Sequence, residues 1–220
     1  MTNLRTIKTC LLAAMIVIGL FAQAKSSHAA EPETLTVAGG CFWCVEADFE
    51  KVSGVIDAVS GFTGGSVENP TYKQVTGGKT GHYEAVQIRF DPAQVSRASL
   101  LALFLRSVDP TDDGGQFCDR GDSYRTAIFA QTPEEHLLAQ AAIDTAQRDL
   151  GQQVVTPVLP TSPFYPAEAY HQDFYKSDSI ILTRFGPKRK SSAYKAYRDA
   201  CKRDQRVRAL WGDAAAFAGS

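Results

Sequence analysis

Two cysteines one helical turn apart carry the clearest chemical signal in this sequence. Cys41 follows Gly39-Gly40, and Cys44 comes three residues later, with Phe42 and Trp43 between them. The glycine pair and the apolar spacing that follows predict that Cys41 stands at a helix N-terminus, where unpaired backbone N–H groups favour a thiolate. Because a thiolate is a strong nucleophile, we predict that Cys41 is the attacking sulfur of a thiol enzyme.

The Cys-x-x-Cys spacing also fits other functions. It is found in thioredoxin-like proteins, where the two thiols exchange disulfides. The Phe42 and Trp43 rings beside the thiol indicate instead a wall for an apolar substrate group. A third alternative is a binding domain in which disulfides staple all the cysteines outside the first thirty residues. A zinc site would need further ligands at regular spacing, and the candidates are scattered: His82, Cys118 and His171.

Glu84 is the second residue that points to chemistry. It lies in the regular strand pattern of residues 83–90, on the same face as Val86 and Ile88. Burial there should raise the pKa of its carboxyl group and keep it protonated near neutral pH, as a general acid requires. The structural alternative is a buried carboxylate paired with an arginine such as Arg125.

The elements that position these residues follow from hydrophobic periodicity. Alternation predicts strands at residues 34–38, 55–62, 83–90, 124–129 and 154–159. Helical spacing predicts helices after Cys41, around Leu100–Val108, and from Pro133 to Gly151. This order predicts an α+β fold, namely a two-layer α/β sandwich of the ferredoxin-like plait type with a mixed sheet. We expect a long irregular C-terminal region from Ser162 onward.

The first thirty residues have the pattern of an export signal. Arg5 and Lys8 precede an apolar run from Leu11 to Ala22, and small residues stand before Glu31. We therefore predict a signal peptide over residues 1–30 and a periplasmic or secreted protein, a setting that permits disulfides. The alternative is an uncleaved membrane anchor, for which the apolar run is short.

Composition sets the remaining limits. The chain has 220 residues, of which 44% are hydrophobic and 21% charged, and its net charge is -1. These values favour one globular domain, expected at residues 31–212 with a disordered tail at 213–220, and give no sign of nucleic-acid binding. We expect a monomer with no bound metal or cofactor, and with no stable membrane span after processing.

Several motifs together resemble the A-type peptide methionine sulfoxide reductases, over nearly the whole chain after the leader. They are Gly40-Cys41-Phe42-Trp43, Gly61-Phe62-Thr63-Gly64-Gly65, Asn69-Pro70-Thr71-Tyr72, Gly81-His82-Tyr83-Glu84, Asp109-Pro110-Thr111, Asp119-Arg120-Gly121-Asp122-Ser123-Tyr124-Arg125 and Glu168-Ala169-Tyr170-His171-Gln172. Phe62, Val108 and Ala169 depart from the family pattern at positions outside the proposed chemistry.

The resemblance implies a role for each matching residue. Cys41 would attack the sulfur of methionine-S-sulfoxide, free or in proteins, while Phe42 and Trp43 receive its methyl group. Glu84 would protonate the sulfoxide oxygen with help from two tyrosines, and a carboxylate would orient the substrate. These three residues are Tyr72, Tyr124 and Asp119. Attack would release methionine and leave Cys41 as a sulfenic acid.

A second thiol must then resolve the sulfenic acid. The resemblance favours Cys201, since C-terminal resolving cysteines are usual in the family, and Lys and Arg far outnumber Asp around it. Cys44 is the second candidate, and Cys118 is expected to be a packing residue. A thioredoxin-like dithiol protein would finally regenerate the enzyme.

Overall fold

The computed structural model describes residues 31–183 and 186–219. The chain divides into two units, residues 1–30 and 31–220, and the following concerns the second. The predicted signal peptide therefore lies outside the described residues. Within them, no helix is both long enough and apolar enough to cross a bilayer.

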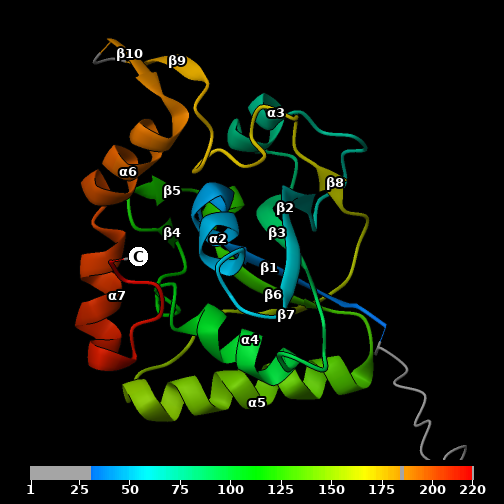
Figure 1. Ribbon diagram of the computed structural model, residues 1–220. Helices are drawn as coiled ribbons and strands as arrows, with labels where there is room; N and C mark the ends of the chain where they lie inside the picture. Colours follow the sequence, from blue (N-terminus) through cyan, green and yellow to red (C-terminus); the bar gives the residue numbers. More distant parts are fainter. Residues whose placement is uncertain (1–30, 184–185, 220) are drawn as a thin grey trace, which may run out of the picture. The chain divides into compact units, whose positions relative to one another are not determined.

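A six-stranded mixed sheet forms the centre of this unit (Figure 1). Its strand order is β7-β6-β1-β3-β2-β8, and all neighbours are antiparallel except β6 and β7. The six strands are β1 (Glu33–Gly39), β2 (Val55–Thr63), β3 (Tyr83–Phe90), β6 (Thr126–Ala130), β7 (Val158–Pro160) and β8 (Tyr165–Pro166). Two separate hairpins pair β4 (Gly115–Gln116) with β5 (Asp119–Arg120), and β9 (Ile180–Thr183) with β10 (Gly186–Arg189).

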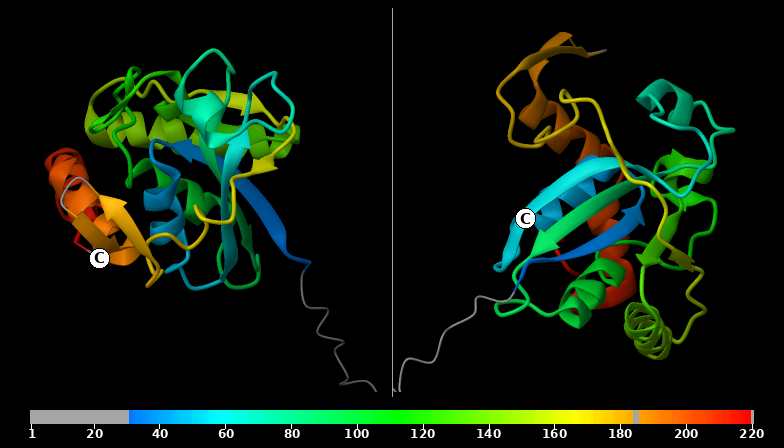
Figure 2. Two further views of the ribbon diagram at one scale, coloured as in Figure 1. Left: turned by 90° about the horizontal axis from the view of Figure 1, so that it is seen from above. Right: turned by 90° about the vertical axis from the view of Figure 1, so that its right-hand side faces the viewer.

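Six α-helices accompany the sheet in the described residues, which confirms the predicted α+β class. They are α2 (Phe42–Phe49), α3 (Tyr72–Thr76), α4 (Arg97–Leu105), α5 (Pro133–Leu150), α6 (Lys190–Ala200) and α7 (Arg203–Trp211). Short 3₁₀ turns cover η1 (Asp122–Tyr124) and η2 (Gly212–Ala214). In the right-hand view of Figure 2, α2 lies behind strands β1, β3 and β2.

Strand alternation in β3 determines where Glu84 points. Glu84, Val86, Ile88 and Phe90 are all buried, and the three apolar members belong to the core that also contains residues of α2 and α4. The intervening residues face the other side of the sheet, where a second apolar cluster contains Ala38, Tyr83, Ala85, Ala127 and Phe129. Glu84 is thus held on the face of the sheet that carries α2, as alternation predicts.

The C-terminal region is the main departure from the expected fold, because it is helical and packed. On α6 the buried residues are Lys190, Tyr194 and Arg198, which a reading based on apolar periodicity counts as polar. The tail, expected to be disordered, also packs: the Phe217 ring lies 5.7 Å from the Phe49 ring, and the Ala216 N–H donates to the Arg106 carbonyl at 3.0 Å.

Helix α3 is a second element that apolar periodicity did not predict. The Thr71 hydroxyl accepts the Gln74 backbone N–H, and the Gln74 side chain accepts the Thr71 N–H. This capping box is encoded by Thr71 and Gln74 three residues apart, a signal that would have predicted the helix.

Candidate active site

The turn from β1 into α2 places Cys41 at the head of the helix. Cys41 is the N-cap of α2, and its carbonyl accepts the Cys44 N–H at 3.0 Å. Gly40 has φ +77°, and a Cβ added to it would lie 2.5 Å from Cβ of Gln116. Glycine is therefore required at this position for two reasons, a left-handed backbone and close packing.

Gly40→Ala should destabilise the protein and reduce its activity by displacing Cys41. The left-handed conformation alone costs an alanine about 1–2 kcal/mol, and the contact with Gln116 adds to that. Gly78→Ala is the matched control, since Gly78 has φ +76° but no atom within 4 Å of the added Cβ. Thermal melts and turnover should show the larger loss in Gly40→Ala; equal losses in both variants would contradict the packing argument.

The two thiols at the start of α2 share one environment, but their pKa values shift in opposite directions. Both are buried and free. Burial, then the hydrogen bond with Cys44 and the nearby carboxyl groups, raises the pKa of Cys41 well above its ordinary value. The hydrogen bond from Cys41 lowers the pKa of Cys44, and the charges of Arg203 and Arg198 add to this. The downward pKa shift expected for Cys41 is thus found at Cys44, because burial outweighs the helix N-terminus at Cys41.

Glu84 lies next to the first turn of α2. The Phe42 backbone N–H donates to its Oε2 at 3.1 Å, and only 1% of the residue is exposed. Burial chiefly raises the pKa of Glu84 to about 8. Its Oε1 has no hydrogen-bond partner among the described residues. Arg125, the alternative partner, lies instead 3.6 Å from Asp122. The site therefore contains a carboxylic acid that is protonated at neutral pH.

Aromatic side chains form a wall beside the thiol. The Phe42 ring is buried and lies 6.0 Å from the Tyr72 ring. Trp43 is half-buried and stacks on Phe174, with ring centroids 3.8 Å apart. This wall matches the apolar surface predicted from the spacing of Phe42 and Trp43, and it would suit a methyl group.

His171 orients Trp43 and was not among the predicted site residues. Its Nδ1 accepts the Trp43 indole N–H at 3.2 Å, and its ring lies 4.3 Å from that of Tyr72. Burial lowers the pKa of His171 to about 4, which keeps the ring neutral and able to accept this bond. The Tyr170-His171-Gln172 motif is the sequence signal that points to this residue.

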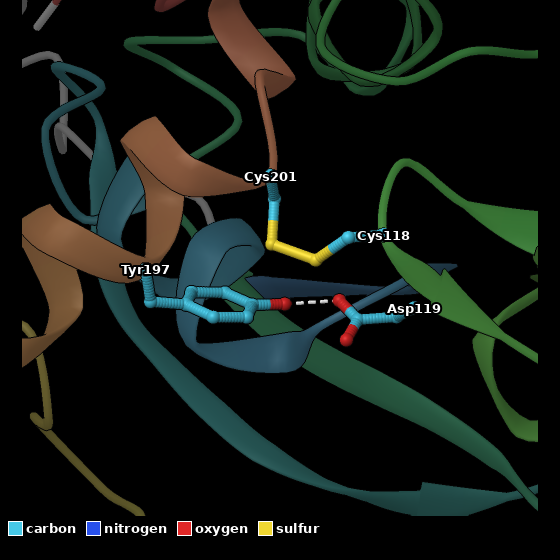
Figure 3. Close-up of a disulfide and its surroundings, with 4 residues drawn as sticks. All are labelled: Cys118, Asp119, Tyr197 and Cys201. Carbon is cyan, nitrogen blue, oxygen red and sulfur yellow. Dashed lines mark hydrogen bonds between the residues drawn. A yellow bond between two sulfur atoms is a disulfide. The ribbon is translucent and has the colours of Figure 1, made fainter. Parts of the chain in front are cut away.

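Three further predicted residues reach the same site. Burial, followed by the charge of Glu84, raises the pKa of both Tyr72 and Tyr124, so both hydroxyls stay protonated donors. Asp119 accepts a hydrogen bond from the Tyr197 hydroxyl of α6 (Figure 3). The Tyr197 ring also lies edge-on to Trp43, 6.3 Å away. Helix α6 therefore borders the site through Tyr197, a residue that sequence reasoning did not select.

The structure joins Cys201 to Cys118 in a disulfide across 83 residues of chain. This overturns the expectation that Cys118 only packs, and in this state Cys201 is not a free thiol that can resolve Cys41. It also contradicts the stapled-domain alternative, because Cys41 and Cys44 are unpaired. Cys118 is exposed and Cys201 half-buried.

Two arginines of the basic C-terminal segment, Arg198 and Arg203, are buried near the two thiols. Nη1 of Arg198 lies 2.9 Å from Oδ1 of Asp48, which is fully buried on α2. Arg203 donates to the Gly39 carbonyl at 3.3 Å and to the Ser107 carbonyl at 2.9 Å. The charges of these two arginines lower the pKa of Cys44, and their contacts hold α6 and α7 against the site. The basic segment was expected instead to favour a Cys201 thiolate.

Comparisons with known proteins agree with this geometry. A family model described as peptide methionine sulfoxide reductase matches residues 33–213. Peptide methionine sulfoxide reductase MsrA 2 of Rhizobium meliloti is 46% identical over 88% of this chain and 90% of its own length. The MsrA 2 of Caulobacter vibrioides is 43% identical over 91% and 95%. The reduced form of Mxr1 from Saccharomyces cerevisiae superposes with a TM-score of 0.62 at 28% identity, over 68% of this chain and 87% of that one. The chain belongs to the A-type peptide methionine sulfoxide reductase family.

Proposed function

We propose that this chain reduces methionine-S-sulfoxide, free or in proteins, to methionine by thiol chemistry at Cys41. The observation that carries the proposal is the buried Glu84 carboxyl group, whose Oε1 has no partner among the described residues and which adjoins the head of α2. A sulfoxide oxygen leaves only after it is protonated, and a neutral carboxyl group is the acid for that step.

The first half-reaction balances within the site. The Cys41 sulfur attacks the sulfoxide sulfur while Glu84 donates its proton to the oxygen, and the Cys41 thiol proton replaces the one that Glu84 gave up. The S–O bond of the substrate and the new S–S bond then break as the hydroxyl group transfers to the Cys41 sulfur, which becomes a sulfenic acid, and methionine leaves. Tyr72 and Tyr124 supply hydroxyl donors to the oxygen, since both stay protonated.

Cys44 is the resolving thiol that the geometry favours. It is buried, hydrogen-bonded to Cys41, and has a lowered pKa. Its thiolate attacks the Cys41 sulfenic acid and expels hydroxide, which takes up the proton that Cys44 gave up and leaves as water. The product is the Cys41–Cys44 disulfide. Cys201, the first choice from sequence, is committed to Cys118 in this structure. A thioredoxin-like dithiol then restores the thiols.

The sequence further supports a cell-envelope setting. The charged start, short apolar run and small residues before Glu31 have the order of a cleavable export signal. We expect residues 1–30 to direct a fused reporter enzyme out of the cytoplasm. Retention of the reporter inside the cell would contradict the periplasmic or secreted location.

The arrangement of the central strands supports the finer ferredoxin-like plait assignment. Strands β6, β1, β3 and β2 are neighbours in that order and all antiparallel. Helix α2 connects β1 to β2, and α4 lies between β3 and β6 in the chain. Two β-α-β units interleaved in this way define the plait.

The proposed activity is tested with the two diastereomers of a blocked methionine sulfoxide, dithiothreitol as reductant, and the full chain as enzyme. Consumption of the S form alone is expected. No consumption, or consumption of only the R form, would refute the proposal. Insulin disulfide reduction that survives Glu84→Gln would favour the alternative, a general dithiol oxidoreductase built on Cys41 and Cys44.

Tyr197→Phe should lower KM for a peptide substrate by up to about tenfold, with kcat little changed. The Tyr197 hydroxyl donates a hydrogen bond to Asp119, the carboxylate proposed to orient the substrate, and therefore competes with substrate for it. A hydrogen bond to a charged group contributes about 1.5–3 kcal/mol. Tyr175→Phe is the control, because its hydroxyl donates to Glu50 at 2.5 Å. An unchanged or higher KM in Tyr197→Phe would show that Asp119 does not contact substrate.

A further inference from the structure

The Cys118–Cys201 disulfide joins one exposed and one half-buried cysteine. Cys118, next to the β4–β5 hairpin, is exposed, and Cys201, at the end of α6, is half-buried. The two thiols of the proposed chemistry are different, since Cys41 is 7% exposed and Cys44 is 2% exposed. A dithiol protein that approaches from solvent therefore meets Cys118 before either of them.

An apolar pocket of about 480 Å³ lies beside this bond. Both disulfide cysteines line it, together with one face of α6 whose residues are mostly small: Ala193, Ala196, Tyr197 and Ala200. Small side chains leave room for the backbone of an incoming loop to approach the sulfur. The pocket thus offers a contact surface directly at the reactive bond.

The same bond adjoins the catalytic site on its other side. Cys118 precedes Asp119, which is hydrogen-bonded to Tyr197, one turn before Cys201 on α6. Figure 3 shows the disulfide and this hydrogen bond next to each other, joining the same two segments. The Tyr197 ring contacts Trp43 beside Cys41. The disulfide is therefore connected to the site of the buried thiols through Asp119, Tyr197 and Trp43.

We propose that Cys118–Cys201 is the disulfide through which the enzyme is re-reduced, with the Cys118 sulfur attacked by a thioredoxin-like dithiol protein bound in this pocket. The inference rests on the proposed function, because it begins from the Cys41–Cys44 disulfide that a turnover leaves. It gives Cys118 a redox role.

The electrons and protons balance over four exchanges, two within the chain and two with the external dithiol. With Cys118 and Cys201 reduced, the Cys201 thiolate attacks the Cys41 sulfur and Cys44 departs as a thiolate. Cys118 then attacks Cys201, which forms Cys118–Cys201 and frees Cys41. The protons of Cys118 and Cys201 end on Cys41 and Cys44. The external dithiol attacks Cys118, expels Cys201, and its second thiol closes its own disulfide and frees Cys118.

The direction of the first exchange follows from the site. Thiol–disulfide exchange is faster when the departing sulfur is the better thiolate. The hydrogen bond from Cys41 is lost once Cys41 is bonded to Cys201, but the charges of the buried Arg203 and Arg198 still lower the pKa of Cys44. Burial instead raises the pKa of Cys41. Attack on Cys41 is thus favoured over attack on Cys44, and the mixed disulfide between Cys41 and Cys201 is the expected intermediate.

The partner contact is tested by trapping. The oxidised full chain is mixed with a thioredoxin that carries Ser in place of its second active-site cysteine, and the mixed disulfide is mapped by mass spectrometry. Attachment to Cys118 is the expected result. Attachment to Cys41, Cys44 or Cys201 would overturn the proposal.

Turnover with two reductants separates this inference from the proposed function. Cys118→Ser should lose at least tenfold in turnover driven by thioredoxin and thioredoxin reductase, but keep most of its turnover with dithiothreitol. If the bond only stabilises the fold, Cys118→Ser lowers the melting temperature and keeps thioredoxin-driven turnover, which refutes the proposal. Failure of the wild type to consume sulfoxide with dithiothreitol would instead refute the proposed function.

The pocket itself is tested on α6. Ala196→Glu places a charge in the pocket and should raise KM for thioredoxin several-fold while dithiothreitol-driven turnover is unchanged. Ser192→Glu lies on the same helix outside the lining residues and is the control. Equal KM values in the two variants would place the docking surface elsewhere.

Discussion

Glu84→Gln should lower kcat for sulfoxide reduction by about 10²- to 10⁴-fold, the range that general acid catalysis contributes. Glutamine keeps the size of the side chain and can place its carbonyl where Oε2 accepts the Phe42 N–H. It has no acidic proton to give to the sulfoxide oxygen. Steady-state kinetics with dithiothreitol measures the loss directly.

The pH dependence distinguishes proton donation from mere positioning. Burial raises the pKa of Glu84 to about 8, so wild-type kcat/KM should fall as the pH rises through about 8. In Glu84→Gln this descending limb should disappear. If the variant has a lower kcat/KM at every pH but still shows the decrease near pH 8, Glu84 positions substrate without donating the proton.

The same substitution, which lowers activity, should raise stability at high pH. The folded-state pKa of Glu84 lies above its unfolded value of about 4.3, so ionising this buried group lowers the free energy of unfolding as the pH rises from about 4 to about 8. Glu84→Gln avoids that loss. Its melting temperature relative to wild type should therefore be higher at pH 9 than at pH 4.

Glu46→Gln is the matched control for all three measurements. Glu46 is equally buried and burial raises its pKa to about 7, but its carboxyl oxygens accept hydrogen bonds from Ser60 and Asp173. It should therefore keep kcat within a few-fold of wild type and retain the descending limb. A collapse of kcat in Glu46→Gln equal to that in Glu84→Gln would remove the case for a specific acid.

The placement of Cys41 and Glu84 was predictable because both depend on local sequence. A glycine pair between an alternating strand and a helical pattern encodes the turn before Cys41, and alternation within β3 encodes the burial of Glu84. Neither inference needs knowledge of distant contacts. The direction of the Cys41 pKa shift does depend on distant contacts, because Cys41 is buried against Tyr194 of α6 and against Phe174.

Long-range contacts account for what sequence reasoning missed. The four cysteines after residue 30 permit three pairings, and spacing gave no reason to join Cys118 to Cys201 across 83 residues. The role of His171 depends on the hydrogen bond that its ring accepts from the Trp43 indole, 128 residues away in the chain. Arginines in a charged run are normally solvated, so the burial of Arg198 and Arg203 could not be inferred from their types.

Arg198→Met should lower the free energy of unfolding by about 3–5 kcal/mol, the cost of removing one partner of a buried ion pair. Arg198 lies 2.9 Å from Asp48, which has no exposed surface. Arg203 remains, but its Nε is 4.0 Å from the other carboxylate oxygen. Denaturant titration at pH 7 measures the loss.

The loss should grow with pH. Burial already raises the pKa of Asp48, and Arg198 is the main group that opposes the shift. Without Arg198 the folded-state pKa rises further, so protonated Asp48 is tolerated at low pH and its ionisation becomes costly as the pH rises. The difference from wild type should be smallest near pH 4 and level off above the new folded-state pKa.

Two further variants make the argument specific. Arg189→Met removes an exposed pair, with Asp178 at 3.0 Å, and should cost no more than about 1 kcal/mol. Adding Asp48→Asn to Arg198→Met removes the stranded charge and should recover part of the lost stability together with its pH dependence. If the double variant is no more stable than Arg198→Met, the loss comes from packing of α6. In that case Arg198 stabilises the C-terminal helices by packing, and its influence on the Cys44 pKa is secondary.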